Sequence, residues 1–368
     1  MAAKKTTIHD VAREADVDYS TVSLALRGDR RIRSYTRQRI QTAAHRLGYV
    51  PNQLARSLSR GATHTIGVML IDIHRGFTDP LEEFQDIADR ARYMISVHFS
   101  SWDQARERAG LRHFCESRVE GVIWAPAQWY GETFAQTVEN MKATGVPVVM
   151  LGLQRPPYDV PFHQVGTSLR DRLTMALDYL MGLGHRHIGL ASAPAPAGTE
   201  ASTAPGRQAD HGAHHSRRYF SQPEGIAMVR QAMQARGLAL AEQDLFTTAD
   251  NDYGGVEIAV HLFRRPREHW PTAVIAADDR LGRALTKGLW ALGVKVPEEI
   301  SVLGFDVPPD ETGQPPLTAV SQDSRRMGTL AMDLLLQLIK HQIPHQPQKI
   351  TVMPPRLVEA GTCGPPRK

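Results

Sequence analysis

The chain has 368 residues, of which 42% are hydrophobic and 22% are charged. This length exceeds what one compact core normally holds, so we expect two or three globular domains. The formal net charge of +4 is unevenly placed, because residues 1–61 carry a net charge of +7 and the remainder a net charge of −3. A basic end on a slightly acidic body is typical of an appended module that binds a polyanion.

The sequence also argues against three classes of protein, which are secreted, membrane-spanning and disulfide-rich proteins. The first 25 residues contain no apolar run, and no stretch of 18 uninterrupted apolar residues occurs anywhere in the chain. Cys115 and Cys363 are too few and too far apart for a disulfide framework. We therefore expect a cytoplasmic protein.

The basic N-terminal part is predicted to form three short helices. A side-chain cap at Thr6 or Thr7 begins the first helix, and a cap at Asp18 begins the second. The third helix is predicted over about 34–47, and Gly48 ends it. Three short helices in this arrangement are consistent with a helix-turn-helix module.

One face of the second predicted helix carries side chains that suit DNA. Ser20, Ser23, Leu24 and Arg27 share that face, and Tyr19 lies at its leading edge. A helix in the major groove uses hydroxyls, a guanidinium and apolar atoms in this way. Arginines 30, 31 and 33 follow at once and can neutralise phosphates. A solvated surface helix is the alternative that these residues alone leave open.

The rest of the chain alternates between predicted strands and helices. Such alternation is the pattern of parallel sheets built from βαβ units. One segment differs, because residues 193–216 hold hardly any bulky apolar side chain, and we expect a flexible surface loop there. The predicted strands are Ile66–Ile71, Gly121–Trp124, Val146–Met150, His187–Leu190, Ala273–Ala276 and Ser301–Phe305.

Several segments closely resemble one known family, the lac repressor/gal repressor family of bacterial transcription regulators. The resemblance begins with Thr7–Ala15, Val17–Ser23 and Leu47–Asn52, and continues through Ala55–Leu58, which is similar to the hinge helix of that family. It extends over most of the chain in the segments Arg118–Ile123, Leu183–Ile188, Val296–Asp306 and Pro316–Val320. Because many segments match in the same order, the resemblance is far more specific than a single motif.

The resemblance implies a DNA-binding surface on the headpiece and hinge. Tyr19, Ser20 and Leu24 would face base edges, and Leu58 would enter the minor groove and kink the duplex. Leu24 departs from the family, which usually places arginine there, so the operator is expected to differ. The full set of expected DNA contacts is Thr7, Tyr19, Ser20, Thr21, Ser23, Leu24, Arg27, Arg31, Tyr49, Asn52, Ala55, Arg56 and Leu58.

The implied fold is a two-lobed α/β core, similar to periplasmic sugar-binding proteins, behind an all-α helix-turn-helix headpiece. The headpiece would comprise 1–51, the hinge helix and linker 52–63, and the effector-binding core 64–362. The first lobe would contain about 64–162 and 323–350. The second lobe would contain about 163–322 and 351–361.

The implied ligand site lies between the lobes, where carboxylates can accept hydrogen bonds from sugar hydroxyls. Two of its positions depart from the family, because Gln222 stands where an arginine is usual and Asn251 where an aromatic residue often stacks. For any single residue, a capping role is an equal alternative. The expected effector contacts are Asp72, Phe77, Ser168, Gln222, Asn251, Asp279, Asp306 and Gln322.

These features predict a repressor that binds a near-palindromic operator as a homodimer and responds to a sugar or related metabolite. No cofactor or bound metal is expected. An enzyme is disfavoured because no phosphate-binding loop, nucleophile elbow or metal-ligand spacing occurs, and His211, His214 and His215 lie in the predicted flexible loop. A transporter's solute-binding protein is disfavoured because it would need an apolar signal peptide, which the first 25 residues do not show, and would not carry a basic headpiece.

Overall fold

The structure is a computed structural model of the whole chain. The residues that it describes are 6–26, 28–49, 62–71, 79–101, 103–127, 131–153, 160–192, 220, 223–248, 251–306, 316–345 and 350–367. The insertion predicted over 193–216 lies outside these residues, and so does the predicted hinge over 52–63 apart from Ala62 and Thr63.

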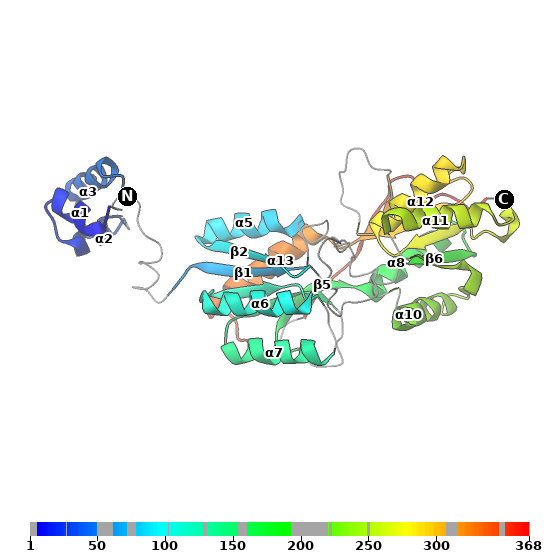
Figure 1. Cartoon of the computed structure of the whole chain (residues 1–368), viewed down its shortest axis with the longest axis horizontal. Helices are drawn as coiled ribbons and strands as arrows, with labels where there is room; N and C mark the ends of the chain where they lie inside the picture. Colours follow the sequence, from blue (N-terminus) through cyan, green and yellow to red (C-terminus); the bar gives the residue numbers. More distant parts are fainter. Residues whose placement is uncertain are drawn as a thin grey trace, which may run out of the picture. The chain divides into compact units, whose positions relative to one another are not determined.

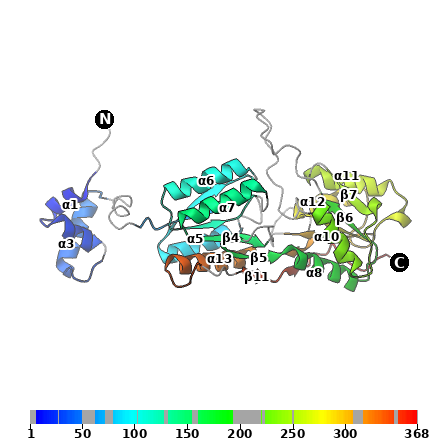
Figure 2. The ribbon, with the colours of Figure 1, turned by 90° about the horizontal axis from the view of Figure 1, so that it is seen from below.

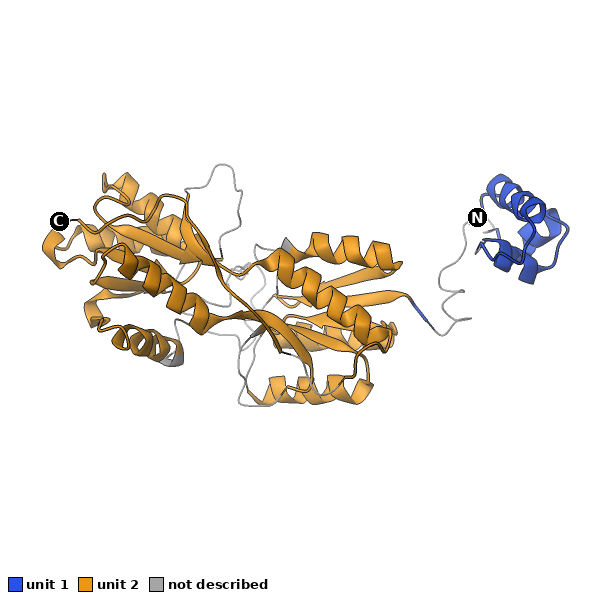
Figure 3. Ribbon diagram, turned by 180° about the vertical axis from the view of Figure 1, so that it is seen from behind, with its two compact units in different colours: residues 1–63 blue, residues 64–368 orange. Residues whose placement is uncertain are grey.

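Contacts divide the chain into two compact units, residues 1–63 and residues 64–368 (Figure 3). The first unit contains the three predicted helices, α1 (Ile8–Glu14), α2 (Tyr19–Leu26) and α3 (Ser34–Arg46). Its core is small and alanine-rich, with Val11, Val22 and Ile40 fully buried at the centre. The helices therefore approach one another closely around three branched side chains.

The second unit holds two six-stranded sheets, each covered by helices on both faces (Figure 1). The first sheet is parallel throughout and has the strand order β11-β5-β4-β3-β1-β2. Its strands are β1 (Thr65–Leu70), β2 (Met94–Phe99), β3 (Gly121–Trp124), β4 (Val148–Leu153), β5 (His163–Ser168) and β11 (Ile350–Met353).

Two apolar cores flank the first sheet. One core contains side chains of α5 (Asp79–Ala91) and α13 (Ser324–Ile339). The other contains side chains of α6 (Gln104–Glu116) and α7 (Glu132–Thr144). Figure 2 shows α6 and α7 on one face of this sheet and α13 on the other. We call this sheet and its four helices the first lobe.

The second lobe repeats this plan. Its sheet has the order β12-β10-β9-β8-β6-β7 and is parallel except for β12. The strands are β6 (Ile188–Ser192), β7 (Leu245–Thr247), β8 (Ala273–Ala276), β9 (Ser301–Phe305), β10 (Thr318–Ser321) and β12 (Arg356–Val358). The helices α8 (Leu169–Gly182) and α10 (Pro223–Gln234) cover one face, and α11 (Asn251–Phe263) and α12 (Asp279–Ala291) cover the other. Short 3₁₀ turns occur at η1 (Glu242–Asp244) and η2 (Arg267–His269).

The chain passes between the two sheets three times. β5 leads into α8, β10 leads into α13, and β11 leads into β12. The boundaries of the lobes therefore differ from those predicted. Residues 163–168 belong to the first sheet, because β5 pairs with β4 and β11, and the predicted C-terminal strand over 351–361 is two strands in different sheets.

The segment that leaves β3 is held by a buried carboxyl group. Oε1 of Glu107, a residue of α6, accepts hydrogen bonds from the indole N–H of Trp124 at 2.9 Å and from the backbone N–H of Ala127 at 2.7 Å. Only 3% of Glu107 is exposed. Burial raises the pKa of Glu107 to about 7, because loss of hydration outweighs the two hydrogen bonds that favour its charged form.

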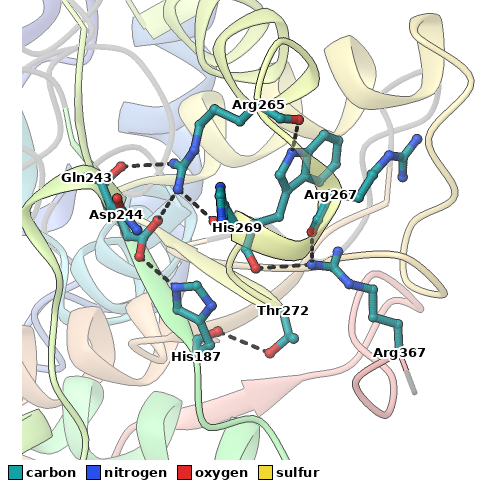
Figure 4. A network of polar contacts seen from close by, with 9 residues as sticks. His187, Gln243, Asp244, Arg265, Arg267, His269, Thr272 and Arg367 are labelled. Carbon is teal, nitrogen blue, oxygen red and sulfur yellow. Dashed lines mark hydrogen bonds and ion pairs between the residues drawn. The ribbon is translucent and has the colours of Figure 1, made fainter.

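At the amino-terminal edge of the second sheet, a polar network ties loops together (Figure 4). Its centre is the fully buried Asp244, whose carboxylate contacts His187 Nε2 at 2.6 Å and Arg265 Nη2 at 3.1 Å. Arg265 also donates to the carbonyl of His269 at 2.6 Å. Arg367, near the end of the chain, donates to the carbonyls of Arg267 and Trp270 at 2.6 and 3.1 Å. The network therefore holds the segments at this edge of the sheet together through paired charges and hydrogen bonds.

The raised pKa of Glu107 predicts a pH-dependent stability. The folded-state pKa of about 7 lies above the ordinary value of 4.5, so the fold favours the protonated carboxyl. The stability that this group contributes is present below pH 4.5 and is lost as the pH rises through 7. Glu107→Gln imitates the neutral form, so between pH 5 and pH 8 its free energy of unfolding should gain about 2.5 kcal/mol relative to wild type.

Urea unfolding at several pH values measures this difference. Glu116→Gln is the matched control, because Glu116 is exposed on the same helix, and its difference from wild type should stay constant with pH. Parallel pH profiles for wild type and Glu107→Gln would show that the carboxyl is ionised at no cost in the folded protein.

Removal of the Asp244 carboxylate should destabilise the second lobe. Asp244→Ala leaves Arg265 and His187 without their shared anion, and breaking a buried ion pair costs about 3–5 kcal/mol. Asp178→Ala serves as the comparison, because Asp178 is 58% exposed in its pair with Arg236, and its loss should be below about 1 kcal/mol. Equal unfolding midpoints for the two variants would contradict a stabilising role for the network.

Candidate functional site

The exposed surface of α2 is the first candidate site. Tyr19 is 54% exposed and Ser20 is exposed, whereas Val22 and Ala25 are buried against α1 and α3. Thr21, Ser23 and Leu24 are half-buried. The three-helix core therefore presents the leading edge of α2 to solvent, and the side chains there are aromatic and hydroxyl groups.

The start of α2 is fixed by Asp18, as predicted. Its Oδ1 accepts the backbone N–H of Ser20 at 2.8 Å. Hydrogen bonding by the side chain of Ser20, and then by its backbone N–H, lowers the pKa of Asp18. The ring of His9 lies 5.3 Å from that of Tyr19, so Tyr19 also has a neighbour on α1. These contacts orient the leading edge of the helix.

Thr7 has a structural role in the unit. It is the N-cap of α1 and forms a capping box with Asp10, in which the Thr7 backbone N–H donates to Oδ2 of Asp10 at 2.9 Å. The Thr7 hydroxyl donates to the same oxygen at 2.7 Å. Thr7 is exposed, and its expected DNA contact remains a prediction.

Arg31 lies in the loop between α2 and α3, where it pairs with Asp29. Its Nη2 is 2.8 Å from Oδ2 of Asp29, and its Nε is 3.1 Å from Oδ1. These bonds lower the pKa of Asp29 to about 2. Arg37 donates to the carbonyls of Asp29 and Ile32, at 2.7 and 3.1 Å. The Arg31 side chain is 78% exposed, so it is both positioned and accessible.

Tyr49 is half-buried against the headpiece core, and its backbone N–H donates to the carbonyl of Ala44 at 2.8 Å. The remaining expected DNA contacts lie outside the described residues; they are Arg27, Asn52, Ala55, Arg56 and Leu58.

The second candidate site is the carboxyl edge of the second sheet. Because β8, β9 and β10 are parallel neighbours, the residues that follow them meet at one edge. Three predicted effector residues lie there, Asp279 after β8, Asp306 after β9 and Gln322 after β10. Gln322 is half-buried, and only 8% of Asp306 is exposed.

The two aspartates that follow β8 have different positions on α12. Asp278 is the N-cap of α12 and accepts the N–H of Leu281 at 2.8 Å. Asp279 is the first residue of the helix and is fully buried. Because Asp278 supplies the cap, capping does not account for the neighbouring carboxylate of Asp279.

Asp306 is held by Arg172, which the sequence reasoning missed. Nη2 of Arg172 lies 2.6 Å from Oδ2 of Asp306, and both side chains are buried. Asp306 has a φ of +60°, a left-handed conformation that is uncommon outside glycine. A signal for Arg172 exists in the sequence, because it falls on the same helical stripe as the apolar residues Leu173, Ala176 and Leu180.

Other expected effector residues lie elsewhere or are not described. Ser168 ends β5 in the first sheet and caps α8, where its Oγ accepts the N–H of Asp171 at 3.4 Å. Asn251 is the first residue of α11. Asp72, Phe77 and Gln222 lie outside the described residues, as do His211, His214 and His215.

The described ranges also bear on metal binding and on insertion into a membrane. No cluster of histidine, cysteine, aspartate and glutamate side chains in them could bind a metal ion. None of their helices has the length and apolar character needed to cross a membrane.

Comparison with known proteins identifies both units. Residues 7–52 match the family described as "Bacterial regulatory proteins, lacI family". Residues 177–363, about half of the chain, match the family described as "Periplasmic binding protein-like domain". The lac repressor resemblance and the two-lobed α/β fold class predicted from the sequence are therefore confirmed.

Relatives match over nearly the whole length. Catabolite control protein A of Priestia megaterium is 27% identical over 353 residues, which cover 92% of this chain and 97% of that protein. The structure of the lac repressor dimer bound to operator and the anti-inducer ONPF has a TM-score of 0.77 and 21% identity, covering 98% of this chain and 99% of that one. A complex of the transcriptional regulator CelR with cellobiose has a TM-score of 0.61 and 22% identity, with 97% and 100% covered. The chain therefore belongs to the family of periplasmic binding protein-like domains, and its N-terminal unit matches the lacI family of bacterial regulatory proteins.

Proposed function

We propose that this protein is a transcriptional repressor that binds a near-palindromic operator as a homodimer and releases or retains it according to a small metabolite. The observation that carries the proposal is the exposed leading edge of α2, which presents Tyr19 and Ser20 from a basic three-helix unit. Such a regulator acts in the bacterial cytoplasm, where the chromosome lies. The named relatives are regulators, and none of them is named as an enzyme.

In the proposed complex, α2 enters the major groove and the following loop contacts the backbone. Tyr19, Ser20 and Leu24 face base edges, while Arg31, already held by Asp29, reaches phosphate. Leu24 offers only apolar contact, which suits a thymine methyl group and does not suit a guanine edge. The operator is therefore proposed to carry an A·T pair at that position.

A homodimer follows from the proposed near-palindromic operator, since each headpiece reads one half-site. We propose that the helices α5 and α13 contribute to the interface. Most of their apolar side chains are buried in the core of the first lobe, including Phe84, Ile87 and Leu335. The exposed apolar side chains Met94 (48%) and Val97 (37%), on the edge strand β2, support a contribution from this strand as well.

The effector is proposed to bind at the carboxyl edge of the second sheet, with Asp279, Asp306 and Gln322 among its contacts. Buried carboxylates at strand ends are the few polar groups that orient a hydroxylated ligand. The similarity to a regulator solved with cellobiose supports a sugar or related metabolite. A ligand changes operator affinity only if it binds the free and DNA-bound conformations unequally.

The DNA contact is tested by selecting bound sequences from random DNA and measuring variants on the selected operator. Tyr19→Ala should weaken specific binding by about 1–3 kcal/mol, because a base-edge contact is lost, and leave binding to random DNA nearly unchanged. Tyr35→Ala is the matched control, since Tyr35 is also exposed, at 72%, but lies on α3. An equal ratio of specific to random binding in wild type and Tyr19→Ala would remove Tyr19 from the base-reading surface.

The effector site is tested with a metabolite that changes operator binding in a screen of sugars and their derivatives. Asp279→Asn keeps the side-chain shape and removes the charge, so affinity for that metabolite should fall by about 1.5–3 kcal/mol. Operator affinity without the metabolite should be unchanged. Asp323→Asn, at the N-cap of α13, is the control, because asparagine caps a helix as well as aspartate does. Unchanged calorimetric affinity in Asp279→Asn would place the effector elsewhere.

A further inference from the structure

Arg172 is a buried charged side chain that lies against aromatic rings. Its guanidinium carbon lies 4.9 Å from the centre of the Phe305 ring, and Phe305 stacks on Phe220 with 5.4 Å between ring centres. The side chain of Arg172 is only 6% exposed. A guanidinium removed from water in this way must be compensated by several hydrogen bonds or by anions.

The compensation supplied by the protein is incomplete. Asp306 approaches Nη2 at 2.6 Å, but the contact is not a well-directed hydrogen bond. Nε is buried as well, and neither Nε nor Nη2 makes a hydrogen bond with the described part of the chain. These two nitrogens form one edge of the guanidinium, with two parallel N–H groups. That edge matches the two oxygens of a carboxylate or phosphate.

The Nε–Nη2 edge of Arg172 lies in the region where the effector is proposed to bind. Arg172 is in the first turn of α8, directly after β5, and its partner Asp306 follows the carboxyl end of β9. At the end of β6, the hydroxyl of Ser192 is also fully buried and has no hydrogen-bond partner among the described residues. A strong double donor and a hydroxyl thus occur at the carboxyl edge of the same lobe.

We infer that the effector carries an acidic group, a carboxylate or a phosphate, which binds the Nε–Nη2 edge of Arg172. The inference rests on the proposed function, in which the core binds a small metabolite. The buried carboxylates of Asp279 and Asp306 receive hydroxyl groups, so the ligand class is a polyhydroxylated acid, such as a sugar acid or a sugar phosphate. A neutral sugar offers only hydroxyl oxygens to this edge, and a hydroxyl is a weaker acceptor for a guanidinium than a carboxylate or phosphate is.

The test compares matched acidic and neutral compounds on the full-length protein. Calorimetry and thermal unfolding are measured with gluconate against sorbitol, glucuronate against glucose, and glucose 6-phosphate against glucose. Acetate and inorganic phosphate, each against chloride at equal ionic strength, probe the guanidinium directly. At least one acidic compound should bind and raise the Tm, while its neutral counterpart binds at least tenfold more weakly.

Three variants connect this effect to Arg172. Arg172→Gln should weaken binding of the acid about 10–100-fold, the range expected for a hydrogen bond to a charged group. Arg172→Lys keeps the charge but lacks the two parallel donors, so it should lose most of the same affinity. Arg170→Gln is the matched control on the same helix, because Arg170 is exposed, and it should bind the acid like wild type.

Arg172→Gln removes the cation that contacts the carboxylate of Asp306, which could itself impair folding. The double variant Arg172→Gln/Asp306→Asn is the control, because it removes both charges of the pair. It should melt cooperatively and still fail to distinguish the acidic compound from the neutral one.

Three outcomes would overturn the inference. They are a preference for a neutral compound, wild-type acid binding by the Arg172 variants, and the lack of an Arg172-dependent effect of any anion. Specific operator binding, measured on the same samples, separates the two proposals. If it is intact, the failure concerns the ligand alone; if no sequence is selected, the proposed function fails.

Discussion

The parallel pairing of the strands is the constraint on which the rest of the core depends. In a parallel sheet every strand ends at the same edge, so residues distant in sequence meet there without any contact between their local segments. In the second lobe this edge collects Asp279, Asp306 and Gln322 from three successive strands. The faces of the same sheet are occupied by two apolar cores. Polar chemistry is therefore confined to the strand ends.

The two edges of the second sheet treat buried charge in opposite ways. At the amino edge, Asp244 is enclosed by His187 and Arg265, and Arg265 also donates to backbone carbonyls. Charges satisfied in this manner stabilise one loop arrangement. At the carboxyl edge, Arg172 has one close anion, and its Nε and Nη2 make no hydrogen bond with the described residues. Incomplete compensation lowers stability, and such sites are characteristically functional.

The sequence predicts the parts of this structure whose signals are local. Strands β3, β8 and β9 are short runs of apolar residues buried on both faces, and their predicted bounds agree with the structure. The strand β5 was missed because its buried residues include His163, Gln164 and Thr167, which carry no apolar pattern. Pairing with β4 and β11 makes it a strand. The Arg172–Asp306 contact was missed for a related reason, since it joins α8 to the end of β9 and no local pattern reveals a partner so distant in sequence.

The same topology indicates how the binding of a ligand at this edge would affect the first lobe. Two of the three connections between the sheets begin at expected effector residues, Ser168 before α8 and Gln322 before α13. Arg172 lies in the first turn of α8, immediately after the first connection. A ligand that exchanges contacts with Arg172 and Asp306 therefore acts on the segment that joins the lobes, while the apolar cores of each lobe remain packed. Packed cores move as rigid bodies, and the connecting segments absorb the change in backbone angles. A difference in ligand affinity between two arrangements of the lobes is therefore expected to arise from contacts at these connections.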